Sequence, residues 1–121
     1  LIPTLPSPVP TPSTSPTLFI LLLTPDTQRA FQKFATQHDD FIHDLSYDFY
    51  GKRLATCSSD QKIKVWDLND RNEWVLSAEW KAHAGSIWKV EWAHPEFGQI
   101  LASCSFDRTV CIWEEQEGVY I

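Results

Sequence analysis

The sequence contains no methionine, only four glycines and no pair of cysteines in the CxxC spacing. Its three cysteines are an odd number without metal-ligand spacing, which argues against both a disulfide framework and a cysteine-based metal centre. His43, Asp44 and His94 likewise lack the spacing of zinc ligands. We therefore expect a reducing compartment, no metal or other cofactor, and three cysteines that pack as small apolar side chains: Cys57, Cys104 and Cys111.

Positive charge is also scarce. Lysine and arginine number 10 against 16 aspartate and glutamate residues, and the net charge is −6. The basic residues occur singly or in pairs, whereas a nucleic-acid-binding face needs a basic stripe. The composition therefore favours a protein partner over a nucleic acid.

Long apolar runs are missing. The longest, Leu18–Leu23, has six residues, far below the roughly 18 that a membrane span requires. No lysine or arginine precedes it, as the basic region of a signal peptide would. Because residues 1–17 are mainly proline, serine and threonine, we expect residues 1–35 to be a low-complexity, disordered leader that is unrelated to the fold.

A stretch of the remaining sequence is written twice, 47 residues apart. The matching positions pair Cys57 with Cys104, Asp60 with Asp107 and Trp66 with Trp113. A repeat of about 40 to 50 residues with strand-forming composition is typical of propeller blades. The sequence therefore predicts an all-β protein.

Each copy contains short runs rich in β-branched and aromatic residues, separated by turn residues. We expect strands at 42–48, 53–58, 63–68 and 74–80 in the first copy, and at 86–92, 100–105, 110–114 and 119–121 in the second. The predicted blades are residues 36–81 and residues 82–121, the latter truncated in its outer strand. Along 74–80, alternation predicts that four apolar residues face one side: Trp74, Leu76, Ala78 and Trp80.

Two blades are fewer than the repeats that usually bury a continuous core. Together with the lack of methionine at position 1, this leads us to expect an N-terminal fragment of a longer protein.

Each copy also has a histidine, then a serine or threonine in a strand, an aspartate in a tight turn and a tryptophan in the next strand. This pattern resembles the WD-repeat signature of β-propellers. The resemblance implies two structural tetrads joined by hydrogen bonds: His38, Thr56, Asp60 and Trp66, and His83, Ser103, Asp107 and Trp113. Since no nucleophile elbow or oxyanion-hole signature surrounds Ser103, we expect no catalytic residues and no enzyme activity.

The sequences of the turns and loops indicate one subfamily of WD-repeat proteins. Tyr47–Gly51, Ala55–Gln61 and Trp92–Gly98 are similar to segments of the small WD-repeat nucleoporins of the Seh-one type. The similarity covers residues 37–115.

A sister family, the Sec-thirteen coat proteins, shares much of this pattern. Gln61, Trp80 and Phe106 favour the nucleoporin family. A scaffold of the vesicle coat (coat protein complex II), or a WD-repeat adaptor in another assembly, stays open as an alternative.

The nucleoporin resemblance implies an open propeller that a strand from an α-solenoid nucleoporin completes. It implies a non-enzymatic scaffold of the Y-shaped subcomplex of the nuclear pore, at the nuclear envelope, which supports transport of mRNA and protein. Membership of a SEA/GATOR-type complex at the vacuolar or lysosomal surface, which regulates target-of-rapamycin signalling, is also implied. A free strand edge attracts such partners, and our candidate contact residues are Phe31, Phe34, Ile42 and Leu45.

Overall fold

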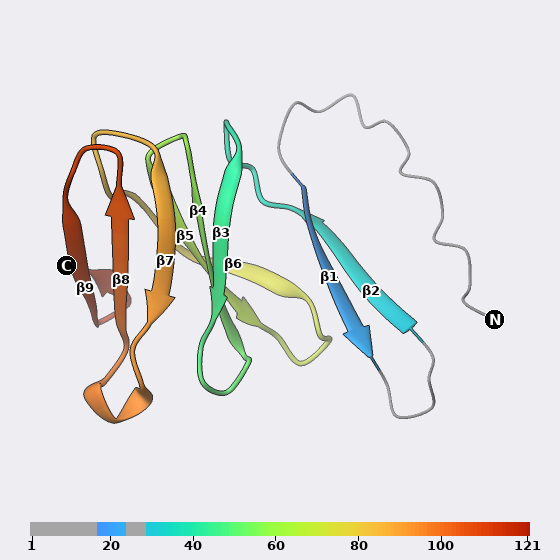
Figure 1. Cartoon of the computed structure of the whole chain (residues 1–121). Helices are drawn as coiled ribbons and strands as arrows, with labels where there is room; N and C mark the ends of the chain where they lie inside the picture. Colours follow the sequence, from blue (N-terminus) through green and yellow to red (C-terminus); the bar gives the residue numbers. More distant parts are fainter. Residues whose placement is uncertain (1–16, 24–28) are drawn as a thin grey trace.

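The computed structural model describes residues 17–23 and 29–121, which form three antiparallel sheets side by side (Figure 1). The first sheet pairs β1 (Thr17–Leu23) with β2 (Arg29–Ala35). The second has the order β3-β4-β5-β6 and the third β10-β9-β8-β7, so each is a meander of neighbouring strands. Their bounds are β3 Ile42–Tyr47, β4 Arg53–Ser58, β5 Lys62–Leu68, β6 Trp74–Lys81, β7 Ile87–Trp92, β8 Ile100–Ser105, β9 Val110–Gln116 and β10 Val119–Tyr120.

The prediction of an all-β fold with two meanders is confirmed, and no strand boundary in these two sheets differs from the expected one by more than two residues. A single 3₁₀ turn, Pro95–Phe97, interrupts the strands of the described segments. No helix among the residues described is long and apolar enough to cross a membrane.

Aspartates fix the turns that set the strand register. The Asp48 carboxylate accepts hydrogen bonds from the backbone N–H groups of Lys52 and Arg53, at 3.0 and 3.1 Å, across the β3–β4 turn. Gly51 in this turn has φ +69°, which glycine adopts without steric strain. Local contacts therefore hold this turn closed.

The predicted alternation along β6 is wrong at its centre. The register of β5 with β6 shifts at a bulge, so that Val65 lies opposite Ala78 but Trp66 lies opposite Leu76. A bulge adds one residue to a strand, here Ser77, and moves the following side chains to the other face. Trp74 and Leu76 therefore share a face with Trp66, while Ala78 and Trp80 share the opposite face with Val65.

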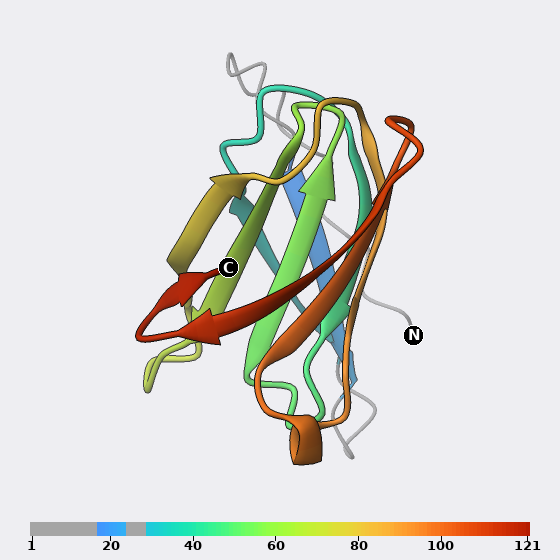
Figure 2. The same cartoon turned by 90° about the vertical axis from the view of Figure 1, so that its left-hand side faces the viewer.

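The core lies between the two four-stranded sheets, which Figure 2 shows one behind the other. Ala55, Cys57 and Ile63 of the first sheet and Ile87 and Leu101 of the second have no exposed surface and form one cluster. At the edges of this core, two hydrogen bonds tie β3 to β7: Val90 N–H donates to the Asp44 carboxylate and Trp92 Nε1–H to the Ser46 carbonyl, at 3.1 and 3.0 Å.

The β1–β2 pair differs from the disorder expected for residues 1–35. Phe19 and Ile20 in the apolar run Leu18–Leu23 favour a strand, in spite of the proline-rich segment before it. Pairing with β2 gives the backbone groups of this run partners within the protein in place of water. The expectation for residues 1–16 and 24–28 lies outside the described residues.

Candidate interaction site

In the first blade, β3–β6, four predicted residues lie in one hydrogen-bonded relay. His38 Nδ1 is 2.9 Å from the Asp60 carboxylate, and His38 Nε2 is 2.9 Å from the Thr56 hydroxyl. Trp66 Nε1 donates to the same hydroxyl at 3.1 Å. Because a carboxylate only accepts, His38 carries its proton on Nδ1, and the Thr56 hydroxyl donates to Nε2.

The second blade, β7–β10, repeats the relay. His83 lies 3.0 Å from the Asp107 carboxylate and 2.8 Å from the Ser103 hydroxyl. Trp113 Nε1 donates to Ser103 Oγ at 3.0 Å. The structure thus brings together all four predicted residues in each blade.

The aspartates also shape the turns that hold them. Asp60 accepts from the N–H of Lys62, and Asp107 from that of Thr109, at 3.0 and 2.9 Å. These side-chain-to-backbone bonds are Asx turns. The residues between, Gln61 and Arg108, have positive φ angles of 73° and 70°, so the same turn geometry occurs in both blades.

Burial and hydrogen bonding set the charge states. Burial lowers the pKa of His38 and keeps the ring neutral in spite of the adjacent Asp60. Burial would raise the pKa of Asp60, but hydrogen bonds from His38 and from two backbone N–H groups outweigh it, and the net pKa is lowered. The pKa of Asp107 is likewise lowered, first by its hydrogen bond with Thr109.

This geometry gives the relay no opening to a substrate. The Ser103 hydroxyl is hydrogen-bonded to both His83 and Trp113, and Ser103 is 3% exposed. A nucleophile needs a free path to the reacting atom and donors for the charge that develops. The described residues contain no group of three or more histidines, cysteines and acids placed to hold a metal ion.

Sequence reasoning missed two cations. Lys64 is 3% exposed, and its ammonium donates to the Thr36 carbonyl at 2.8 Å and pairs with Glu79 at 3.3 Å. The second blade has Cys111 at the equivalent position. This difference between the two copies was the sequence signal that could have pointed to Lys64. Lys64 fastens the chain just after β2 to the first blade.

The other cation is Arg53, which joins the two blades. Its guanidinium pairs with Asp67 of its own blade and with Glu115 of the second, both at 2.7 Å. It also donates to the hydroxyl of Tyr120 at 3.3 Å. Nothing in the spacing of these residues along the chain pointed to the contact.

The four candidate partner contacts lie at different places. Phe34 of β2 packs edge-on against Trp66 with ring centres 5.0 Å apart, and Leu45 belongs to the same small cluster. Ile42 opens β3 and is half-buried outside that cluster. Phe31 lies in β2, and its side chain is outside the described part.

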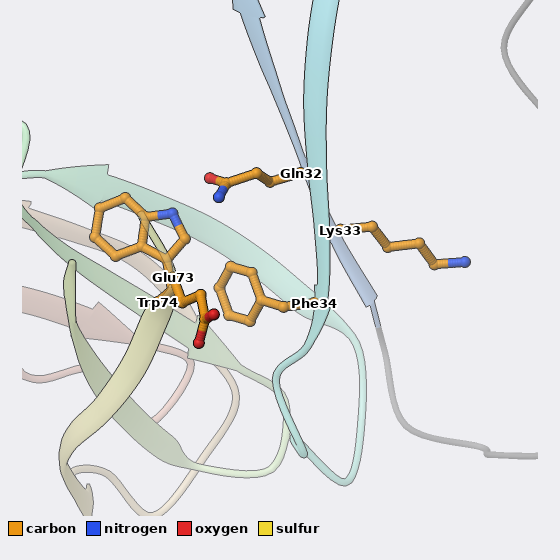
Figure 3. Close-up of a pocket in the computed structure, with 5 residues that line it drawn as sticks. All are labelled: Gln32, Lys33, Phe34, Glu73 and Trp74. Atoms are coloured by element: carbon orange, nitrogen blue, oxygen red, sulfur yellow. The ribbon is translucent and has the colours of Figure 1, made fainter. Parts of the chain in front are cut away.

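A groove of about 420 Å³ separates β2 from the start of β6. Figure 3 shows Gln32 and Phe34 pointing from β2 toward Trp74, while Lys33 points to the other side of the strand. Glu73 lies beside Trp74, and both Glu73 and Lys33 are among the residues that line the groove. The groove was not predicted, because the bulge that turns Trp74 toward β2 has no local sequence signature.

Two four-stranded sheets that pack face to face, each closed by a His–Thr/Ser–Asp–Trp relay, define neighbouring blades of a WD-type β-propeller. The model of the WD domain, G-beta repeat family matches residues 30–67 and 74–114, and the chain belongs to this family. Each match begins in the outer strand that precedes a blade, so β2 stands to the first blade as β6 stands to the second.

Within the family, the chain is similar to the proteins named Nucleoporin SEH1. Identity is 63% over 87 residues to those of Osmerus mordax and Danio rerio, and 60% to that of Homo sapiens. The aligned part is 72% of this chain and 24% of each relative. The chain therefore spans about a quarter of the length of the curated relatives it matches.

Proposed function

We propose that the chain is part of a non-enzymatic scaffold of the nuclear pore Y-shaped subcomplex, where it supports transport of mRNA and protein. The identity of 60–63% to Nucleoporin SEH1 proteins supports the assignment. The polar side chains of both relays form hydrogen bonds with one another, so the surfaces and strand edges are what the protein offers to others.

The observation that carries the proposal is the incomplete sheet beside the first blade. The β1–β2 sheet has two strands, whereas each blade has four. One edge of β2 pairs with β1, and no other described strand pairs with its second edge. A partner strand added there gains main-chain hydrogen bonds and covers an edge prone to aggregation.

The side chains beneath this sheet fit the same role. The outward face of the first blade holds a small cluster in which Leu54 and Trp66 are buried and Leu45 and Trp74 are partly covered, and Phe34 of β2 packs against it. The β1–β2 sheet occupies the position of a neighbouring blade over this face (Figure 1). We propose that an α-solenoid nucleoporin supplies the missing strands and completes the cover, with Phe31, Phe34 and Leu45 in the contact and Ile42 at its border.

The proposed location and the proposed complexes follow from the resemblance to the Seh-one-type nucleoporins. We place the protein at the nuclear envelope, in the nuclear pore complex, and extend the proposal to a SEA/GATOR-type complex at the vacuolar or lysosomal surface. The relatives reported above carry the name nucleoporin, which favours the pore over a vesicle coat. The blade limits 36–81 and 82–121 remain our proposal for the repeat units.

Hydrogen exchange tests strand addition. The amides of Arg29–Ala35 should become protected when an α-solenoid nucleoporin binds the chain, because a new strand takes up the free edge of β2. The control is β6, Trp74–Lys81, which is the edge of its own sheet and should not change. A complex that forms without added protection in β2 contradicts the proposal.

A further inference from the structure

Alternate residues at the end of β2 contact the first blade, and the residues between them are exposed. The contacting residues are spaced two apart: Gln32, Phe34 and Thr36. Their partners on the blade are, in the same order, the Asn72 carbonyl, the Trp66 ring and the Lys64 ammonium. Lys33 and Ala35 lie between them and are exposed, and Figure 3 shows Lys33 on the other side of the strand. One side of β2 is therefore attached to the blade at three successive points.

The attachment to Lys64 is the most buried of the three. Lys64 is 3% exposed, Thr36 has no exposed surface, and Lys64 Nζ lies 2.8 Å from the Thr36 carbonyl oxygen. Glu79 of β6, whose side chain is 45% exposed, pairs with the same ammonium at 3.3 Å. A hydrogen bond from a charged donor is roughly twice as strong as one between neutral groups. Replacing Lys64 by an apolar residue therefore removes a strong contact to the chain just after β2.

The strand β2 depends on such contacts more than β6 does. It belongs to a sheet of two strands, and a two-stranded pair is only marginally stable in water unless it packs against other structure. In contrast β6, which stands to the second blade as β2 stands to the first, pairs with β5 in a sheet of four strands. The position of β2 is therefore set by its contacts with the blade.

The two blades differ at the position of Lys64. The edge-on aromatic contact of β2 is repeated by β6, where Trp80 packs against Trp113 with ring centres 5.4 Å apart. The ammonium is not repeated, since Cys111 occupies the position of Lys64, and a thiol is only a weak donor. The charged contact is thus present only where the outer strand belongs to a two-stranded sheet.

We propose that Lys64 is a positioning residue for strand addition, which holds β2 extended against the first blade so that its free edge is already formed when the partner binds. The inference rests on the proposed function and deepens it, because it names the residue on which the edge depends. A partner that binds only the ordered edge has an affinity proportional to the fraction of chains in which β2 is closed on the blade. Lys64 sets that fraction.

Amide exchange of the whole chain without a partner tests the effect on β2. In Lys64→Met, which keeps an unbranched side chain, the amides of Arg29–Ala35 should exchange at least about tenfold faster. Those of β8, Ile100–Ser105, should not change, because β8 lies in the second blade. Lys89→Met is the matched control: it removes the same charge from an exposed side chain of the second blade and should leave β2 unchanged.

Lys64→Cys is the second variant, and it decides the test if the first blade does not fold with methionine. It gives the first blade the residue that the second blade has at this position, Cys111, and should accelerate exchange in β2 as Lys64→Met does. Unchanged exchange of β2 in both variants overturns the proposal. Equal acceleration in β2 and β8 in both variants also overturns it, because Lys64 would then stabilise the whole fold and not position one strand.

A second arm measures the affinity of an α-solenoid nucleoporin for the same chains. The affinity should fall in the Lys64 variants by the factor by which the closed fraction of β2 falls, a link that a residue that only stabilises the fold would not produce. Partner-induced protection of β2 in the unchanged chain, together with unaltered β2 exchange in both Lys64 variants, overturns the role of Lys64 alone. Faster β2 exchange in these variants, without partner-induced protection in the unchanged chain, supports the positioning of β2 by Lys64 and contradicts strand addition.

Discussion

The relay of the first blade makes a strong quantitative prediction at Thr56. Its side chain has no exposed surface, and its hydroxyl contacts two buried groups. It accepts from Trp66 Nε1 at 3.1 Å and donates to His38 Nε2 at 2.9 Å. Thr56→Ala removes the shared oxygen, so both partners lose their hydrogen bond in one step.

The magnitude follows from the two orphaned groups. A buried polar group without a partner costs about 1–3 kcal/mol, and water cannot reach a position that the surrounding residues fill completely. Allowing for some relaxation, we expect Thr56→Ala to lower the free energy of unfolding by about 2–4 kcal/mol. Thr56→Val keeps the shape and should cost a similar amount.

Thr56→Ser is the matched control, because Ser103 performs the same role in the second blade at 2.8 Å from His83 and 3.0 Å from Trp113. It keeps the hydroxyl and loses one methyl group, worth about 1 kcal/mol. Urea unfolding of the whole chain under reducing conditions, monitored by tryptophan fluorescence, measures all three variants. If alanine and serine at this position are equally stable within about 0.5 kcal/mol, the hydrogen-bond relay contributes nothing and our reasoning fails.

Three further predictions concern charge and reactivity. Arg53→Met should lower the free energy of unfolding by about 1–2 kcal/mol, because the guanidinium pairs with carboxylates of both blades. Urea unfolding measures this loss, and an unchanged midpoint of the transition contradicts the prediction. Burial lowers the pKa of His38 from its usual 6.5, so the unfolded chain binds more protons there. Stability should be full above about pH 6.5 and fall as the pH is lowered through that value; His38→Gln should flatten this slope in unfolding measured from pH 8 to 5. Burial raises the pKa of Cys57 to about 12, so iodoacetamide at pH 8 should label half-buried Cys104 and Cys111 first, as mass spectrometry can show.

The sequence was sufficient for features that repeat. Strands 53–58 and 100–105 were predicted with their observed bounds, and both relays join the residues that the WD-repeat resemblance implied. These features depend on local turn chemistry and on contacts within one blade. A second copy of the same pattern provided an internal check of each position.

Features that depend on a single copy could not be predicted. The bulge at Ser77 turns Trp74 and Leu76 away from Ala78, and no residue type marks it. Arg53 meets Glu115 only because two blades pack side by side, a contact between residues far apart in the chain. The contact of Lys64 with the Thr36 carbonyl also joins residues far apart in the chain, and it depends on the path of the chain before the first blade.

Equivalent residues of the two blades lie in different environments, although they occupy the same repeat positions. Ile63 and Val65 of the first blade are completely buried, while the residues at the same repeat positions in the second blade, Val110 and Ile112, are 70% and 63% exposed. The pairing with the preceding strand is the same in both blades, but Ile63 and Val65 also lie opposite Trp80 and Ala78 of β6, whereas β10 pairs only with Glu115 and Gln116. In addition, the second blade covers the face of the first blade that holds Ile63, and no described residues cover the matching face of the second blade. A polar substitution at Ile63 therefore places a polar group in the core, whereas one at Ile112 places it in water. The repeat pattern fixes which side chains a blade presents, and the outer strand and the neighbouring blade together decide whether they stabilise the fold or form a surface for another sheet.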